Sequence, residues 1–159
     1  SFIAMETGYS TLDINTMVLG GHGDTMVPMH RYTTIAGIPI SNFIDKDRLD
    51  EIVERTRHGG AEILALRQNS SAYDAPAASV AEMVDAIVHD RKRILPTVSI
   101  LEGEYGHEDI AIGVPSVLGS SGMEAIISLD MNDAETTMFH NSAALVRKEI
   151  DLLKQLKGL

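Results

Sequence analysis

Apolar and polar positions in the first forty residues predict a short helix followed by strands. Apolar residues at helical spacing between residues 2 and 5 predict the helix, and Gly8 offers the residue type that commonly ends one. Residues 12–19 alternate imperfectly between apolar and polar types, which predicts a buried strand that runs into a pair of glycines. One or two further strands are predicted over residues 32–40.

A long amphipathic helix is predicted next. Asp45 or Asp47 offers a side-chain cap for it, and the pattern continues to about Gln68. Its apolar stripe is Leu49, Ile52, Val53, Thr56, Ile63 and Leu66. Gly59 and Gly60 interrupt the pattern, and each glycine costs about 1 kcal/mol relative to alanine in a helix. A kink or a close contact with another segment is therefore expected there.

A third helix is predicted to begin either at Pro76 or at Ser79. Proline is favoured in a first helical turn, whereas Ser79 and Glu82 have the spacing of a capping box. The apolar stripe predicted for this helix is Val80, Met83, Val84, Ile87 and Val88.

The period of the pattern then changes from helical to strand-like. Residues 94–101, 110–118 and 124–129 are short, rich in β-branched types and separated by glycine-containing turns, which predicts an antiparallel meander. A last helix is predicted from a cap at Asn132 to about Leu156. Its predicted buried side is Met138, Leu145, Val146, Ile150 and Leu153. The fold class is therefore α+β, with long helices packed on an antiparallel sheet.

Composition and charge narrow the classes of partner. Hydrophobic residues make up 44% and charged residues 23% of the 159 residues, which is typical of a globular chain with a core. The formal net charge of −10 would repel phosphate backbones and anionic lipid, so neither nucleic acid nor a membrane is an expected partner. The one basic run, Arg91–Arg93, is interpreted as a solvated helix end. The absence of cysteine is compatible with a reducing cytoplasm.

Several motifs of cofactor and metal sites are missing. There is no G-x-G-x-x-G fingerprint and no P-loop, and Gly119–Gly122 is interpreted as a hairpin turn. None of the six histidines belongs to a zinc-binding pattern, so no metal site is predicted. His107 with Glu108 and Asp109 has the ligand types for a hard cation, but a polar loop is the favoured interpretation.

His22 is different from the other histidines. It stands between Gly21 and Gly23, directly after a predicted buried strand. Imidazole titrates near neutral pH, so it can both accept and donate a proton, and flanking glycines let a substrate approach its ring. From spacing alone, a turn histidine without chemistry is the favoured interpretation. Asp24 need not be its partner, because adjacent side chains often point apart.

The residues around His22 resemble the signature at the catalytic histidine of the lactate/malate dehydrogenase family. The form Gly-Gly-His-Gly-Asp, followed by Thr-Met-Val-Pro, is most similar to the bacterial lactate-dehydrogenase-like malate dehydrogenases; lactate dehydrogenases usually carry Glu in place of Gly21. The likeness extends over nearly the whole chain. Its other segments are residues 1–6, 32–39, 57–63, 73–79, 90–93 and 113–115.

The resemblance implies that residues 1–159 are the substrate-binding, catalytic domain of an NAD-dependent enzyme. His22 would exchange a proton with malate or oxaloacetate while a hydride passes between substrate and nicotinamide. Residues 71–76 resemble the segment that lines the pocket, which places Ala72 near the substrate and Pro76 near the nicotinamide. A cytoplasmic enzyme of the tricarboxylic acid cycle is expected. A lactate-dehydrogenase-type 2-hydroxy acid dehydrogenase is the alternative activity.

Other parts that the resemblance implies are not in this sequence. The family's Asp-x-x-Arg motif, which orients the histidine and binds the substrate carboxylate, would precede Ser1, as would the Rossmann domain and the loop that selects the substrate. The chain alone is therefore expected to have negligible dehydrogenase activity. A non-catalytic oligomerisation module is the second alternative. The helix around residues 57–67 is the candidate contact in a homodimer or homotetramer.

Overall fold

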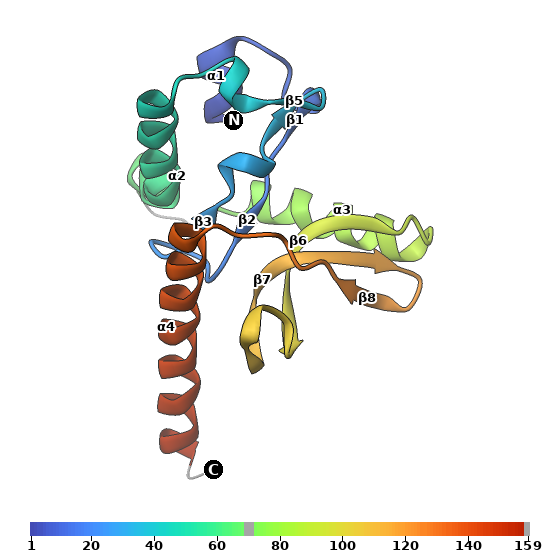
Figure 1. Cartoon of the computed structure of the whole chain (residues 1–159). Coiled ribbons are helices and arrows are strands. Elements are labelled where there is room, and N and C mark those ends of the chain that lie inside the picture. Colours follow the sequence, from blue (N-terminus) through green and yellow to red (C-terminus); the bar gives the residue numbers. More distant parts are fainter. Residues whose placement is uncertain (69–71, 158–159) are drawn as a thin grey trace. The chain divides into compact units, whose positions relative to one another are not determined.

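The computed structural model describes residues 1–68 and 72–157, which form two compact units (Figure 1). The first unit comprises Ser1–Val18 and Pro28–Ala72, and the second comprises Leu19–Val27 and Tyr73–Leu159. Each unit is described by itself below. Within the described residues, no helix has the length and apolar character that a membrane span requires.

Two helices of the first unit pack against each other. Helix α1 (Phe2–Thr7) ends at Gly8 in a left-handed conformation with φ of 74°, as predicted. Helix α2 (Lys46–Arg67) begins where Asp45 accepts a hydrogen bond of 2.9 Å from the Arg48 N–H, which confirms the predicted cap.

The glycine pair of α2 has one member in contact with α1. A Cβ atom at Gly59 would lie 3.5 Å from the Phe2 ring, whereas one at Gly60 would meet no atom within 4 Å. The helix runs through both glycines without interruption. The helix therefore has no kink at this pair, and the contact at Gly59 is an ordinary van der Waals distance that does not require glycine.

The single strand predicted over residues 12–19 is wrong. Ser10 accepts a hydrogen bond from the Leu12 N–H and starts a 3₁₀ turn, η1 (Thr11–Asp13), so only β1 (Ile14–Asn15) and β2 (Val18–Leu19) are extended. A serine that bonds its own neighbouring backbone favours a turn over a strand.

A small sheet and an aliphatic cluster complete the first unit. β1 pairs with β4 (Thr34–Ile35), which turns through Ala36 and Gly37 into β5 (Ile38–Pro39), so the strands predicted over residues 32–40 are confirmed. The cluster consists of Ile35, Ile40, Ile44, Leu49 and Ile52. The last two turns of α2 lie outside it, and Leu66 is 84% exposed.

The second unit contains the predicted meander. β6 (Arg93–Glu102), β7 (Glu108–Gly119) and β8 (Gly122–Ile126) pair antiparallel in that order. A two-residue turn joins β7 to β8, as predicted for this glycine-flanked segment. Helices α3 (Asp74–Val88) and α4 (Asp133–Lys157) both contact β7. The expected α+β class, long helices on an antiparallel sheet, is confirmed.

Helix α3 begins at Asp74, ahead of both predicted starts. Pro76 fits its first turn because a backbone N–H there needs no helical partner. The Ser79 hydroxyl donates to the Ala75 carbonyl inside the helix, so it caps nothing. Of the predicted apolar stripe, Met83 and Ile87 are half-buried, whereas Val80, Val84 and Val88 are 58%, 51% and 70% exposed. Ala86 is the residue of α3 that is buried.

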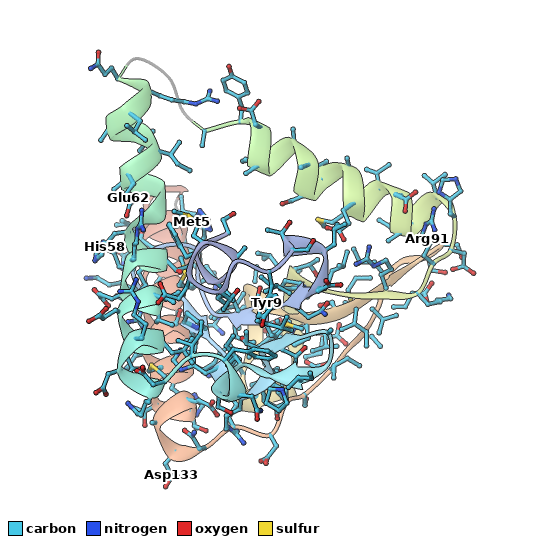
Figure 2. All side chains as sticks on the ribbon, turned by 90° about the horizontal axis from the view of Figure 1, so that it is seen from above. Met5, Tyr9, His58, Glu62, Arg91 and Asp133 are labelled. Carbon is cyan, nitrogen blue, oxygen red and sulfur yellow. The ribbon has the colours of Figure 1, made fainter. Side chains whose placement is uncertain are left out.

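The basic run lies just beyond α3, where Figure 2 labels Arg91. Arg91 pairs with Asp85, Lys92 with Glu124 and Arg93 with Glu82. The run is therefore a solvated helix end, as interpreted, and acidic neighbours on the same unit compensate its charge.

Helix α4 is held at its start by the predicted capping box. The Asn132 N–H donates to the Glu135 carboxylate and the Glu135 N–H donates to the Asn132 side-chain oxygen, both at 2.9 Å. The predicted buried side is only partly right, because Leu145 and Leu153 are 48% and 56% exposed. The buried residues of the helix are Glu135, Phe139, Ser142 and Ala143. Two of them are polar, and hydrogen bonds let them occupy the buried face.

Candidate functional site

The glycine-rich loop connects β2 to β3 (Val27–Pro28) and touches β7 through backbone alone. Gly20 and Gly113 exchange two hydrogen bonds of 2.9 and 3.0 Å. A Cβ atom on Gly113 would lie 2.6 Å from the Gly20 carbonyl oxygen, closer than real Cβ atoms come to a backbone oxygen. The approach therefore requires glycine at position 113.

The next residues of the loop are bound to α4. The Gly21 N–H donates to the Ser142 hydroxyl oxygen at 2.8 Å, and that hydroxyl donates in turn to Thr25 Oγ1 at 3.2 Å. Ser142 is completely buried. One side chain of α4 thus holds the loop at two positions that flank His22.

His22 lies at the tip of this loop, which the contacts with β7 and α4 leave exposed to solvent. Its side chain is exposed between Gly21 and Gly23, whose φ is +125°, and the Met26 N–H donates to the Gly23 carbonyl at 3.0 Å to close the turn. Over residues 1–68 and 72–157, no hydrogen bond or ion pair involves the His22 ring, and none joins it to Asp24. The imidazole is open to a substrate on a backbone that is fixed at both flanks.

The two other predicted site residues lie at the start of the α3 segment. Ala72 is half-buried in an irregular stretch before α3, and Pro76 is exposed in its first turn. Ser71, the first residue of the predicted pocket-lining stretch, lies outside the described residues. The assignments of Ala72 to substrate and Pro76 to nicotinamide remain predictions.

A model of the lactate/malate dehydrogenase α/β C-terminal domain matches residues 1–157. The chain belongs to the lactate/malate dehydrogenase family. It is 62% identical over 154 residues to a malate dehydrogenase of Thioalkalivibrio sulfidiphilus, covering 97% of this chain and 50% of that protein. The chain therefore spans about half the length of the curated relatives it matches.

Solved structures of the family have the same fold. A malate dehydrogenase structure from Salinibacter ruber matches 99% of this chain and 51% of its own, with a TM-score of 0.95 and 46% identity. A lactate dehydrogenase from Eimeria maxima with NADH and oxamate matches 99% of this chain and 50% of its own, with a TM-score of 0.94 and 34% identity.

A histidine pair separate from His22 lies at the end of the β6–β7 hairpin of this lactate/malate dehydrogenase domain. His107 Nε2 is 2.7 Å from Nδ1 of His140 on α4, and its ring packs against Phe139. Arg147 donates to the carbonyls of Glu108 and Asp109. In the described ranges no three potential ligands gather for a metal ion. The contacts favour a structural role for His107, the polar-loop interpretation.

The titration of this pair is expected to decrease the free energy of unfolding at pH values below neutral. Burial, with the neighbouring charges of His140 and Arg147, lowers the pKa of His107 below its ordinary 6.5. The unfolded chain then binds a proton at a pH where the folded chain does not, so the free energy of unfolding decreases as pH falls through 6.5 towards the lower folded-state value. Urea midpoints between about pH 5 and 7.5 measure this. A His107→Gln variant should have the flatter profile, and an equal slope in both proteins would contradict the assignment.

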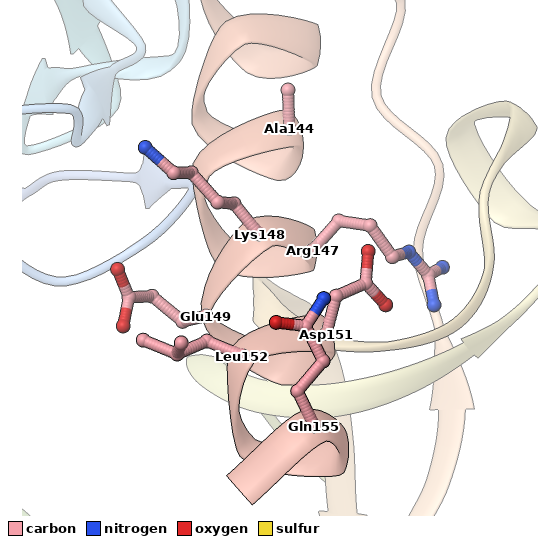
Figure 3. A pocket seen from close by; sticks show the side chains of 7 residues that line it. All are labelled: Ala144, Arg147, Lys148, Glu149, Asp151, Leu152 and Gln155. Atoms are coloured by element: carbon pink, nitrogen blue, oxygen red, sulfur yellow. The ribbon is translucent and has the colours of Figure 1, made fainter.

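A hollow on α4 is a poor ligand site. Figure 3 shows its lining side chains, all from one helix. They are Ala144, Arg147, Lys148, Glu149, Asp151, Leu152 and Gln155. Because a single helix supplies every wall, polar groups do not converge on an enclosed space as they do in a binding pocket. None of the predicted site residues belongs to it.

The sequence predicts His22 as a site residue but gives no direct sign of the residues that fix its loop. Ser142 is 121 positions from Gly21, and nothing in the pattern of α4 links the two. One signal was available: a serine at a position that shares the buried helix face with Phe139 must have a hydrogen-bond partner.

Proposed function

We propose that this chain is the substrate-binding, catalytic half of an NAD-dependent malate dehydrogenase. The observation that carries the proposal is the exposed imidazole of His22 on a loop with both flanks fixed. Its support comes from the curated relatives, which are malate dehydrogenases at up to 62% identity. Gly21, where lactate dehydrogenases usually carry Glu, also favours malate over lactate.

His22 has the role of general acid and base. In malate oxidation it accepts the proton of the substrate C2 hydroxyl as the hydride leaves the same carbon, so the C–H and O–H bonds break and the carbonyl of oxaloacetate forms. NAD, when bound, supplies the nicotinamide that takes up this hydride. In the reverse direction the protonated ring donates to the carbonyl oxygen and stabilises the negative charge that develops there.

Residues at the start of α3 fit the nicotinamide end of NAD, whereas the β7–β8 turn does not fit its phosphates. Pro76 is exposed, and Val80 one turn later is 58% exposed, so these two side chains offer an apolar surface to a ring. In the β7–β8 turn, by contrast, the Ser120 N–H donates to Asp90 and the Ser121 N–H to Glu124. Carboxylates thus occupy the backbone donors that a phosphate would need. We assign Pro76 to the nicotinamide, Ala72 to the substrate and the phosphates to the N-terminal Rossmann domain.

Assembly is a second proposed role, in addition to catalysis. Arg57 pairs with Glu54, and Arg55 with Glu62, along α2; His58 and Glu62 are labelled on this helix in Figure 2. The following turns expose Ile63, Leu64 and Leu66 by 40%, 52% and 84%. Exposed apolar side chains beside charged ones are typical of an interface. We propose that α2 contributes to a homodimer or homotetramer.

The test of the function uses this chain joined to its NAD-binding domain. We expect NADH consumption with oxaloacetate that is much faster than with pyruvate, and negligible consumption by the 159-residue chain alone. Faster turnover of pyruvate would establish the lactate-type alternative. Turnover of neither substrate by a correctly assembled protein would leave assembly as the function. We also propose that the enzyme is cytoplasmic, and fractionation of the source cells followed by the same activity assay tests this.

A further inference from the structure

We propose that Ser142 is a positioning residue for the loop of the acid/base histidine, a role that rests on the proposed function of His22. The Ser142 hydroxyl accepts the Gly21 N–H at 2.8 Å and donates to Thr25 Oγ1 at 3.2 Å. One oxygen atom therefore joins the two ends of a five-residue loop whose second residue is His22. Nothing else on α4 is bonded to this loop within the described residues.

The position of Ser142 is fixed by contacts of the preceding turns of α4. The capping box of Asn132 and Glu135 sets the start of α4, and Phe139, one turn before Ser142, is fully buried with its ring 5.0 Å from that of Tyr105. The Tyr105 hydroxyl donates to the Ile127 carbonyl and accepts from the Leu129 N–H. The helix that carries the hydroxyl is thus anchored to the segment that follows the sheet.

The space around the hydroxyl suits serine and few other residues. A Cβ atom at Gly20 would lie 2.8 Å from Ser142 Oγ, and one at Gly21 would lie 3.3 Å from a Val146 methyl group. Alanine at position 142 would fit, but it would leave the Gly21 N–H without its acceptor. A backbone donor that loses its partner inside a protein is costly, so the loop is expected to move until the N–H reaches water.

Movement of the loop displaces the reacting group. Gly23, with φ of +125°, adds no stiffness to the tip. A shift of about 1 Å in a catalytic group lowers rates by roughly 100-fold, because proton transfer needs a short, aligned hydrogen bond. The Ser142 hydroxyl is completely buried and bonds only to the loop within the described residues, so its loss should change the chemical step more than binding.

The experiment compares Ser142→Ala, Ser142→Cys and Thr25→Val in the complete enzyme. We expect Ser142→Ala to lower the single-turnover rate of hydride transfer about 10- to 100-fold, with KM for oxaloacetate and NADH affinity changed by only about threefold. The deuterium isotope effect on kcat with deuterated NADH should rise as chemistry becomes limiting. Cysteine is somewhat larger than serine and accepts hydrogen bonds weakly, so the activity of Ser142→Cys should fall between those of the wild type and Ser142→Ala. Thr25→Val should be milder, and adding it to Ser142→Ala should change nothing further.

Ser99→Ala is the matched control. Ser99 is also a buried serine, with its hydroxyl 2.8 Å from that of Ser116, but it belongs to β6. A loss of stability without a change in the isotope effect is expected there. Wild-type hydride transfer in Ser142→Ala, in an enzyme that His22→Asn inactivates, would overturn the positioning role. Activity that survives His22→Asn would instead overturn the proposed function. If Ser142→Ala does not fold, additive effects of Thr25→Val and Ser142→Cys would refute the shared hydroxyl link.

Discussion

Replacing His22 by Asn in the complete enzyme is expected to lower kcat/KM for oxaloacetate reduction by about 100- to 10,000-fold. Asparagine has a similar size and can hydrogen bond to a carbonyl oxygen, but it cannot give up or take a proton near neutral pH. The exposed ring makes no contact within the described residues that its loss would break. Stability and oligomer size should therefore be unchanged. Steady-state kinetics measures the loss of kcat/KM, and size-exclusion chromatography measures the oligomer size.

The control for this substitution is His89→Asn. His89 is likewise exposed, and it follows α3, where it pairs with Asp85. Wild-type turnover is expected in this variant. Unchanged turnover in His22→Asn would show that His22 is a turn histidine without chemistry, and a changed oligomer size would show that the loop takes part in assembly.

Replacing Gly113 by Ala is expected to destabilise the chain by about 2–4 kcal/mol. The added Cβ would lie 2.6 Å from the Gly20 carbonyl oxygen, which belongs to the backbone and cannot rotate away. Overpacking of this kind costs roughly 1–3 kcal/mol, and each backbone hydrogen bond lost from the bridge costs about 1 kcal/mol more. Because Gly20 begins the His22 loop, turnover should fall with stability. Urea unfolding of the purified variant gives the free-energy change.

Gly60→Ala is the matched glycine substitution for this test. A Cβ at Gly60 would meet no atom within 4 Å, and the residue lies inside α2. Alanine is favoured over glycine in a helix by about 1 kcal/mol, so this variant should be more stable than the parent. Equal stability of the Gly113 and Gly60 variants would contradict the steric account. A loss of oligomer in Gly60→Ala would show that this face of α2 is covered by a partner.

Elements with local signals could be predicted from the sequence. Asp45, Asn132 and Gly8 mark helix ends through bonds and conformations that involve only neighbouring residues. The meander follows from β-branched runs between turns. The α3 start was wrong because Asp74, two residues before the proline, extends the helix without a side-chain cap bond. The strand over residues 12–19 was wrong because the Ser10 hydroxyl favours a turn.

Burial and the candidate site depended on contacts that are distant in sequence. The valines of α3 match a helical stripe, yet they are exposed, and Ala86 is the buried residue of a helix that contacts β7. His22 was predicted from its glycine neighbours, which are local. Ser142 and Gly113 were missed because they meet the loop only after the sheet and α4 have packed.

The capping box at Asn132 has a consequence for how this segment tolerates change in length. The capping box fixes both the rotation of the helix about its axis and its position along that axis. Ser142 follows after a fixed number of residues in one continuous helix. Each residue advances the side-chain direction by about 100°, so a single deletion between the two points would turn Ser142 away from Gly21. Exposed side chains in residues 133–141 other than His140, which contacts His107, should tolerate exchange, whereas an insertion or deletion there would separate the histidine loop from its support.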